Sequence, residues 1–186
     1  MTEEPAIESA PQTAKPRWGV ILIWVLVLGL LAILGLGLIR AQQGPMGVGA
    51  EAPPFSLTTF DGETIDVGAL RGQVVVVNFW ASWCKPCEQE AADLEAAWQQ
   101  YADRRVVFVG VNYVDTRPEA MEYLDRFGVT YPNGPDLGTR ISQAFRIRGV
   151  PETYVIDGRG ILAAVRIGPY ESLAAIQADI QQAMVP

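Results

Sequence analysis

The 186-residue sequence contains no histidine and only two cysteines. The lack of histidine excludes the Ser-His-Asp and Cys-His hydrolases, imidazole zinc and copper sites, and His-ligated haem. Two cysteines are too few for a disulfide-dense scaffold or a four-cysteine zinc site. Basic residues are in the minority, with 14 Lys and Arg against 21 Asp and Glu and a net charge of −7. This balance argues against a nucleic-acid partner, which would need a basic face.

One long run without any charge lies near the N-terminus, over Trp18–Ile39. As a helix it would reach about 33 Å, enough to cross a hydrocarbon core of about 30 Å. A cleaved signal peptide is the alternative, but signal peptides have a shorter apolar region and end at a small-residue cleavage site. This run instead ends in Ile39-Arg40. The sequence therefore predicts one transmembrane helix, a signal anchor in contact with the lipid bilayer.

The regions on either side of this span differ in charge and composition. Two basic residues precede the span and only Arg40 follows closely, which by the positive-inside rule favours a cytoplasmic N-terminus. Residues 1–17 are predicted to be a disordered cytoplasmic tail, and the glycine-rich residues 40–50 a flexible tether. Residues 51–186 then form one domain on the outer (periplasmic or extracytoplasmic) side of a cell membrane.

Within that domain, segments typical of strands alternate with segments typical of helices. Asp61-Gly62 between two short β-rich runs is a hairpin signal. The pattern predicts an α/β fold, a central mixed sheet with helices on both faces. The predicted strands are 55–59, 63–67, 74–79, 106–112, 153–156 and 162–167, and the predicted helices are 84–101, 116–127, 136–145 and 172–184.

Both cysteines follow a predicted strand, where the chain turns into a helix, and active groups of α/β folds lie at such strand ends. Cys84 would occupy the helix N-terminus, where free N–H groups, the helix dipole and Lys85 stabilise a thiolate. Cys87, one turn further along, is expected to be more shielded. Cys84 would therefore attack a partner disulfide, and Cys87 would release the mixed disulfide. Half of a zinc site and an inert structural disulfide are the alternatives for a C-x-x-C pair.

Glu90 lies three residues after Cys87 and therefore on the same helix face, which points toward the core. Burial would raise its pKa, so that it could accept and return a proton near neutral pH. The alternative is an ordinary first-turn acid that favours the helix dipole.

Pro151 directly precedes a predicted strand, a position that suits a residue unable to donate a ladder hydrogen bond. A cis proline here could present an unpaired backbone edge to a partner peptide next to Cys84. Composition alone favours the alternative, a turn with a trans proline.

The stretch VVVVNFWASWCKPCEQE, followed later by GVPETYVID, resembles membrane-anchored thioredoxin-like proteins of the TlpA, ResA and DsbE (CcmG) type. The opening APPFSLTTFDGETIDVGALRGQ resembles their N-terminal hairpin. The resemblance covers residues 51–184. It implies a thioredoxin-like fold with an N-terminal β-hairpin and a helical insertion at residues 116–145.

The resemblance also implies roles for individual residues. Cys84 would be the attacking cysteine, Cys87 the resolving cysteine, Pro151 the cis proline packed against the disulfide, and Glu90 the acid of the C-x-x-C-x-x-E motif. Apart from the redox-active disulfide Cys84–Cys87, neither a cofactor nor a metal is expected. The residues expected to bind substrate or to tune the site are Trp80, Trp83, Lys85, Pro86, Val150 and Glu152.

The expected function is that of an extracytoplasmic thiol–disulfide oxidoreductase, used mainly as a protein-disulfide reductase. By resemblance, the clients would be apocytochrome c, in cytochrome c maturation, or copper-site proteins of cytochrome oxidase. Electrons would come from a membrane thiol carrier of the CcdA/DsbD type.

Two other functions stay open at this point. The hairpin region of this chain also resembles that of peroxiredoxin-type thiol peroxidases, but those enzymes carry a threonine where this chain has Ala81. Copper-binding chaperones of the Sco type have a similar fold, but they use C-x-x-x-C and a distant histidine. The choice between reductant and oxidant is also open, because Lys85 and the helix end favour a thiolate whereas an ionised Glu90 opposes it.

Overall fold

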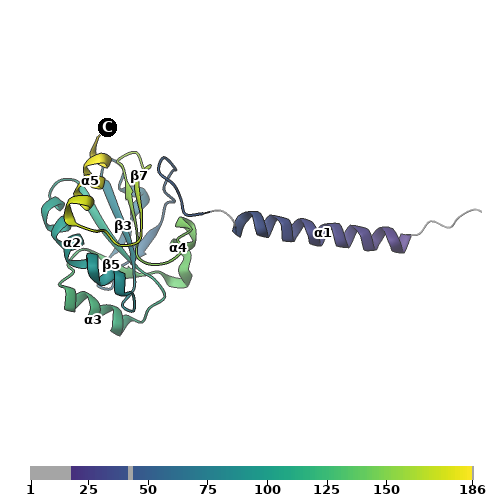
Figure 1. The fold of residues 1–186 in the computed structure, drawn as a ribbon, viewed down its shortest axis with the longest axis horizontal. Coiled ribbons are helices and arrows are strands. Elements are labelled where there is room, and N and C mark those ends of the chain that lie inside the picture. Colours follow the sequence, from purple (N-terminus) through teal and green to yellow (C-terminus); the bar gives the residue numbers. More distant parts are fainter. Residues whose placement is uncertain (1–17, 42–43, 186) are drawn as a thin grey trace, which may run out of the picture. The chain divides into compact units, whose positions relative to one another are not determined.

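The computed structural model describes residues 18–41 and 44–185, and the chain divides into two units after Gln43 (Figure 1). The first unit contains α1 (Trp18–Ala41). Within α1, Ile21–Leu38 has a mean hydropathy of 2.9 and is long and apolar enough to cross a membrane. The predicted tail at residues 1–17 lies outside the described residues.

The second unit has a mixed five-stranded sheet, in the order β5-β4-β3-β6-β7, and a separate hairpin of β1 and β2. Strand β3 runs parallel to β4 and antiparallel to β6. This is the predicted α/β architecture with an N-terminal hairpin. The strands are β1 (Ser56–Thr58), β2 (Thr64–Asp66), β3 (Val74–Trp80), β4 (Val106–Asn112), β5 (Asn133–Pro135), β6 (Glu152–Ile156) and β7 (Leu162–Ile167), and the helices are α2 (Lys85–Tyr101), α3 (Arg117–Phe127), α4 (Arg140–Phe145) and α5 (Leu173–Met184).

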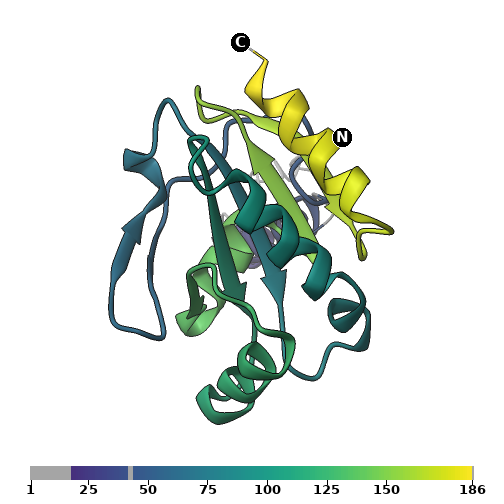
Figure 2. The ribbon, with the colours of Figure 1, turned by 90° about the vertical axis from the view of Figure 1, so that its left-hand side faces the viewer.

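Helices cover the sheet on both faces, which explains why every residue of the central strand β3 is buried. Val76 of β3 belongs to a core cluster with residues of α2 and α5. Val75 and Phe79 belong to a second cluster on the opposite face, with residues of α4 and Leu57 of the hairpin. Figure 2 shows α2 and α5 side by side in front of the sheet. Strand β3 therefore lies in the interior, and its carboxyl end leads directly to the cysteines.

Strand β5 was not expected from the sequence, because Asn-Gly-Pro is typical of a turn. It pairs with the edge of β4 at Gly110–Asn112. A side chain at Gly110 would overlap the Asn133 amide, so glycine allows the two strands to approach closely. The pairing depends on residues far apart in the sequence, which local propensity does not register.

The predicted helix over 136–145 is also shorter than expected. Gly138 has a φ of +68°, and α4 begins at Arg140. The Asp136 carboxylate accepts hydrogen bonds from the backbone N–H groups of Ile141 and Ser142, at 3.0 and 2.8 Å. Asp136 therefore caps the start of α4 from outside the helix.

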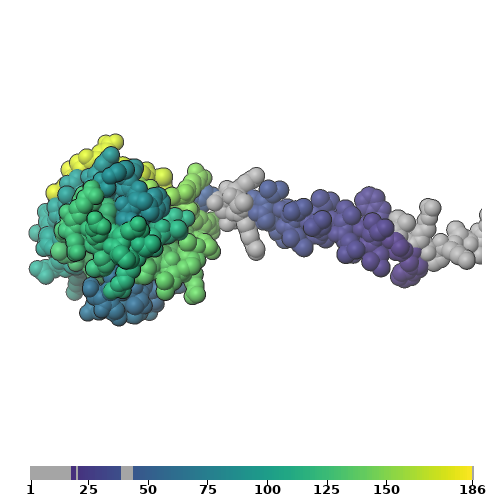
Figure 3. Space-filling view, turned by 90° about the horizontal axis from the view of Figure 1, so that it is seen from below, coloured from purple at the N-terminus to yellow at the C-terminus, as the bar shows by residue number. Residues whose placement is uncertain are grey.

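In the space-filling view, the face toward the reader is formed largely by the segment from α2 to α4 (Figure 3).

The structure differs from the predicted flexible tether over Gly44–Ala50. The Gly49 N–H donates to the Leu162 carbonyl at 2.8 Å, and the Leu162 N–H donates to Ala50 at 2.9 Å. Met46 packs against the core cluster on the α4 face. These residues are part of the second unit because the edge of β7 offers them hydrogen-bond partners, which composition alone does not reveal.

Candidate active site

A disulfide joins Cys84 and Cys87 at the start of α2, with 5.3 Å between the two Cα atoms. Cys84 is the N-cap residue of the helix, and its sulfur accepts a hydrogen bond from the Cys87 N–H at 3.2 Å. Pro86 lies in the first turn, where its missing N–H costs no hydrogen bond. A thiolate at Cys84 would face the same N–H groups and the positive end of the helix dipole.

The two cysteines are almost equally buried, with 2% of Cys84 and 1% of Cys87 exposed. The expectation that Cys87 is the more shielded is therefore not met in the disulfide form. The neighbouring residues Trp83, Lys85 and Pro86 are exposed, so the disulfide lies directly beneath the surface. Position on the helix, rather than exposure, distinguishes the two sulfurs.

The two tryptophans before the disulfide have different environments. Trp80 is 2% exposed, stacks on Tyr123 with 4.6 Å between ring centroids, and donates to Asn133 Oδ1 at 2.7 Å. Trp83 is 58% exposed, and its indole N–H donates to the Val114 carbonyl at 3.0 Å. Trp80 is thus a core residue, whereas Trp83 presents a fixed apolar surface beside the cysteines.

The charge of Lys85 is shared with a carboxylate on the same helix. Its Nζ lies 3.0 Å from Glu88 Oε1, and Arg126 lies 3.2 Å from the other oxygen of Glu88. The hydrogen bond from Lys85, with help from Arg126, holds the pKa of Glu88 below its usual value. Lys85 therefore stabilises a Cys84 thiolate less than an unpaired lysine would.

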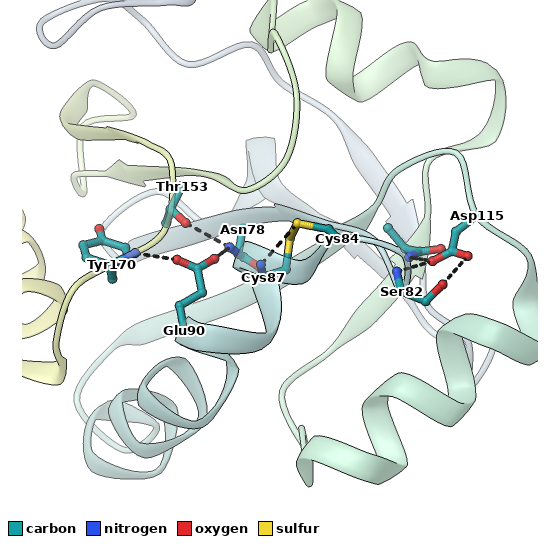
Figure 4. The surroundings of a disulfide bond; sticks show 9 residues. Asn78, Ser82, Cys84, Cys87, Glu90, Asp115, Thr153 and Tyr170 are labelled. Atoms are coloured by element: carbon teal, nitrogen blue, oxygen red, sulfur yellow. Dashed lines mark hydrogen bonds between the residues drawn. A yellow bond between two sulfur atoms is a disulfide. The ribbon is translucent and has the colours of Figure 1, made fainter.

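Glu90 is 1% exposed and lies in the interior, one helical turn after Cys87 (Figure 4). Its Oε1 accepts a hydrogen bond from Asn78 Nδ2 at 2.9 Å, and its Oε2 accepts one from the Tyr170 N–H at 2.8 Å. Burial raises the pKa of Glu90 to about 7, although both hydrogen bonds act in the opposite direction. Glu90 is thus a carboxyl group that can exchange a proton at neutral pH, and not an ordinary first-turn acid.

The Val150–Pro151 peptide bond is cis, and Pro151 is buried. Val150 packs against the cluster of side chains that contains both cysteines. The Pro151 carbonyl accepts a hydrogen bond from the Gly168 N–H at 3.0 Å. The loop before β6 is therefore held beside the disulfide.

Glu152 follows this proline and is 1% exposed. Its carboxylate accepts hydrogen bonds from the Arg148 N–H and from the Tyr154 hydroxyl, both at 2.7 Å. These contacts leave Glu152 inside the protein, so direct substrate binding does not fit its position. The remaining expectation for Glu152 is that it tunes the site by holding the proline loop.

Asp115 belongs to the site but was not singled out from the sequence. Its carboxylate accepts hydrogen bonds from the Ser82 N–H at 2.7 Å, the Ser82 hydroxyl at 2.8 Å and Asn112 Nδ2 at 2.9 Å (Figure 4). Burial alone would raise the pKa of Asp115, but the donors on Asn112, Ser82 and Thr116 outweigh it and lower the pKa. The sequence did hold a signal for Asp115, because it is a polar residue just beyond the carboxyl end of β4, where active groups of α/β folds lie. Its partner Ser82 was not evident, because the two lie 33 residues apart.

Replacing Asp115 with asparagine should loosen the turn that leads into Cys84. One of the two acceptor oxygens becomes an N–H donor, which leaves at least one of the donors to Asp115, most of them part-buried, without its partner. We expect the free energy of unfolding to fall by about 1–3 kcal/mol, measured by urea denaturation. The exposed Asp103 provides the matched control, since Asp103→Asn should leave the urea midpoint unchanged. Equal midpoints for the two variants would contradict the anchoring role of Asp115.

The described residues contain no group of three or more side chains arranged to hold a metal ion. The chemistry available at this site is the reversible reduction of one disulfide, with the interior carboxyl group of Glu90 one helical turn away. Opening the disulfide takes up two electrons and two protons.

Known proteins share both the sequence pattern and the fold. Residues 48–165 match the AhpC/TSA family. The chain is 37% identical over 153 residues to the thiol:disulfide interchange protein DsbE of Allochromatium vinosum, covering 78% of this chain and 81% of that protein. It is 33% identical over 123 residues to the thioredoxin-like protein YneN of Bacillus subtilis, covering 64% and 71%. A crystal structure of a thioredoxin-family thiol:disulfide interchange protein from Chlorobium tepidum superposes with a TM-score of 0.67 at 30% identity, covering 74% and 98%.

Proposed function

The chain belongs to the AhpC/TSA family of thioredoxin-like proteins, and from that premise we propose that it reduces disulfides of client proteins outside a cell membrane. Its relatives are named thiol-disulfide oxidoreductases and thiol:disulfide interchange proteins, and this chain is a thiol–disulfide oxidoreductase. The observation that carries the reductive direction is the interior carboxyl group of Glu90, one turn behind the disulfide.

The electrostatics of the site support reduction rather than oxidation. A thiolate at Cys87 would lie near Glu90, and an ionised carboxylate in the interior disfavours a second negative charge. Lys85, the cation expected to favour a thiolate, is paired with Glu88. The dithiol form is therefore disfavoured relative to the disulfide, which makes the pair a better electron donor.

In the proposed reaction the Cys84 thiolate attacks one sulfur of a client disulfide. The client S–S bond breaks, an S–S bond forms between Cys84 and the client, and the other client sulfur leaves as a thiolate. Glu90 then takes the proton of Cys87, and the Cys87 thiolate attacks Cys84. The mixed disulfide breaks, and the client leaves as a dithiol after taking up protons. Two electrons pass to the client, and the Cys84–Cys87 disulfide remains.

The cis Pro151 and the exposed Trp83 have complementary roles in this proposal. An extended client segment would run along the backbone beside Pro151, and Trp83 would contact its apolar side chains. Ser82 and Asp115 keep the turn in place while Cys84 changes partner. A membrane dithiol of the CcdA/DsbD type would regenerate the reduced form by the same exchange in reverse.

For location, we propose that α1 is a membrane anchor and that the second unit lies on the outer side. The support is the length and hydropathy of Ile21–Leu38 together with the charges that flank it. For clients, we propose either the C-x-x-C-H disulfide of apocytochrome c or the disulfides of copper-site proteins of cytochrome oxidase. A peptide of each kind, offered in oxidised form to the reduced full chain, would separate the two.

The reduction potential of the Cys84–Cys87 pair tests the reductive direction. We expect a value nearer to that of thioredoxin, about −270 mV, than to that of DsbA, about −120 mV. Equilibration of the full chain in detergent with glutathione or dithiothreitol buffers gives this value. A potential in the DsbA range would mean that the protein oxidises its clients. In a separate assay with peroxide, rapid consumption of the peroxide would favour a peroxidase.

A further inference from the structure

The second donor to Glu90 comes from the loop between β7 and α5, 80 residues away in the chain. Tyr170 contributes its backbone N–H, at 2.8 Å from Glu90 Oε2. In the same loop, Gly168 has a φ of +90° and donates its N–H to Pro151. The loop thus touches both Glu90 and the cis proline, and its exact course determines where the Tyr170 N–H points.

The side chain of Tyr170 fixes this course. Its ring is 3% exposed and belongs to the core cluster between α5 and the sheet. Its hydroxyl donates to Asp179 Oδ2 at 2.9 Å, and Arg166 lies 3.1 Å from the same oxygen. The Arg166 guanidinium also lies over the Tyr170 ring, 5.2 Å from its centroid. We call the contacts among Tyr170, Asp179 and Arg166 the tyrosine clamp.

The clamp stays intact over the pH range in which Glu90 titrates. Burial, followed by the charge of Asp179, raises the pKa of Tyr170, so its hydroxyl remains a donor. The hydrogen bond from Arg166 to Asp179 raises the pKa of Arg166, which remains a cation. The protonation states of Tyr170 and Arg166 therefore stay constant while Glu90 titrates, and neither residue takes part in the proton exchange.

Few groups near Glu90 change charge in that range. Tyr123 on α3, Tyr131 before β5 and Tyr170 interact electrostatically with Glu90, and burial raises the pKa of all three, so they stay neutral. Asn78 does not titrate. Cys87 and Glu90 remain as the groups that exchange a proton behind the disulfide.

We propose that Tyr170 is a positioning residue for the proton transfer: the clamp on its ring and hydroxyl holds its backbone N–H against Glu90 Oε2. This inference rests on the proposed role of Glu90. A hydrogen bond to a carboxylate favours the ionised form, which is the form that accepts the Cys87 proton. If the clamp is released, the pKa of Glu90 rises. Glu90 then accepts the proton of Cys87 only at a higher pH.

The test compares Tyr170→Phe with Tyr101→Phe in the full chain in detergent. Both tyrosines are 3% exposed and belong to the same core cluster, but Tyr101 has its hydroxyl near Gln181, at 3.4 Å, and no hydrogen bond to Glu90. The titration midpoint of the Glu90 carboxyl carbon, followed by NMR, should rise by about 0.5–1 unit in Tyr170→Phe. It should stay at the wild-type value in Tyr101→Phe.

A second variant and a second readout keep the two proposals apart. Asp179→Ala removes the acceptor of the Tyr170 hydroxyl without altering the ring, and it should raise the same midpoint. Unchanged midpoints in both clamp variants would overturn the inference. The pH profile of client reduction should lose its Glu90 step in Glu90→Gln; if that step persists, the proposed role of Glu90 fails, whatever the clamp variants show.

Discussion

The Cys87→Ser variant is expected to accumulate as a covalent complex with its client, whereas Cys84→Ser is expected to lose exchange to the background rate. Cys84 is the N-cap of α2, where the helix end would stabilise its thiolate, so we expect it to form the first bond to the client. Cys87 then completes the exchange from one turn further into the helix. Without its thiol, the mixed disulfide has no internal route to resolution.

The complex is measured on non-reducing gels of membranes that carry the full chain, with the captured protein identified by mass spectrometry. The variant with both cysteines changed to serine is the matched control and should capture nothing. Capture of a protein with a C-x-x-C-H segment would support apocytochrome c as the client. If Cys84→Ser captures clients and Cys87→Ser does not, the roles of the two cysteines are reversed.

The Glu90→Gln variant should slow the attack of Cys87 on the mixed disulfide. It should also remove the contribution of Glu90 to the pH dependence of the unfolding free energy. General acid–base catalysis contributes about 100-fold or more, so resolution of the mixed disulfide at pH 7 should slow by about that factor. Stopped-flow mixing of the reduced full chain with a synthetic peptide disulfide separates resolution from attack. Attack by Cys84 should keep nearly its wild-type rate, because the hydrogen bonds of the Glu90 carboxylate go to Asn78 and Tyr170 and not to Cys84.

The effect on stability has a definite sign. Burial raises the pKa of Glu90 from 4.5 to about 7, a difference that corresponds to roughly 3 kcal/mol. The folded state binds this proton more tightly than the unfolded chain does. The stabilisation is therefore fully present below pH 4.5 and is lost as the pH rises through about 7. The difference in unfolding free energy between wild type and Glu90→Gln should decline by that amount over this window.

Glu88→Gln on the same helix is the matched control for stability. Because hydrogen bonding from Lys85 lowers the pKa of Glu88, its stabilisation is present above its ordinary pKa and is lost only in acid. This variant should show no decline between pH 5 and 8. A flat difference for Glu90→Gln over the same range would mean that Glu90 titrates as an exposed carboxylate does.

Several elements followed from the sequence because their signals are local. The apolar run over 74–79 predicts the strand that the structure shows as β3, and the helix predicted over 116–127 is α3, whose N-cap is Thr116. The spacing of Glu90 from Cys87 placed both on one helix face. Strand β5, the start of α4 and the attachment of Gly44–Ala50 were missed, since each depends on a partner distant in the chain.

Residue types and their spacing were enough to predict the chemistry: two sulfurs at a helix start, an acid one turn behind them, no histidine, and one run that is long and apolar enough to cross a membrane. Which groups lie near those sulfurs, and how strongly they act, depends on how the chain folds. The tertiary structure buried Glu90 under hydrogen bonds from Asn78 and Tyr170, paired Lys85 with Glu88, and brought Asp115 to Ser82. Residue types and short spacings fix which reactions are available, but pKa values depend on burial and on charges that only the folded chain brings together.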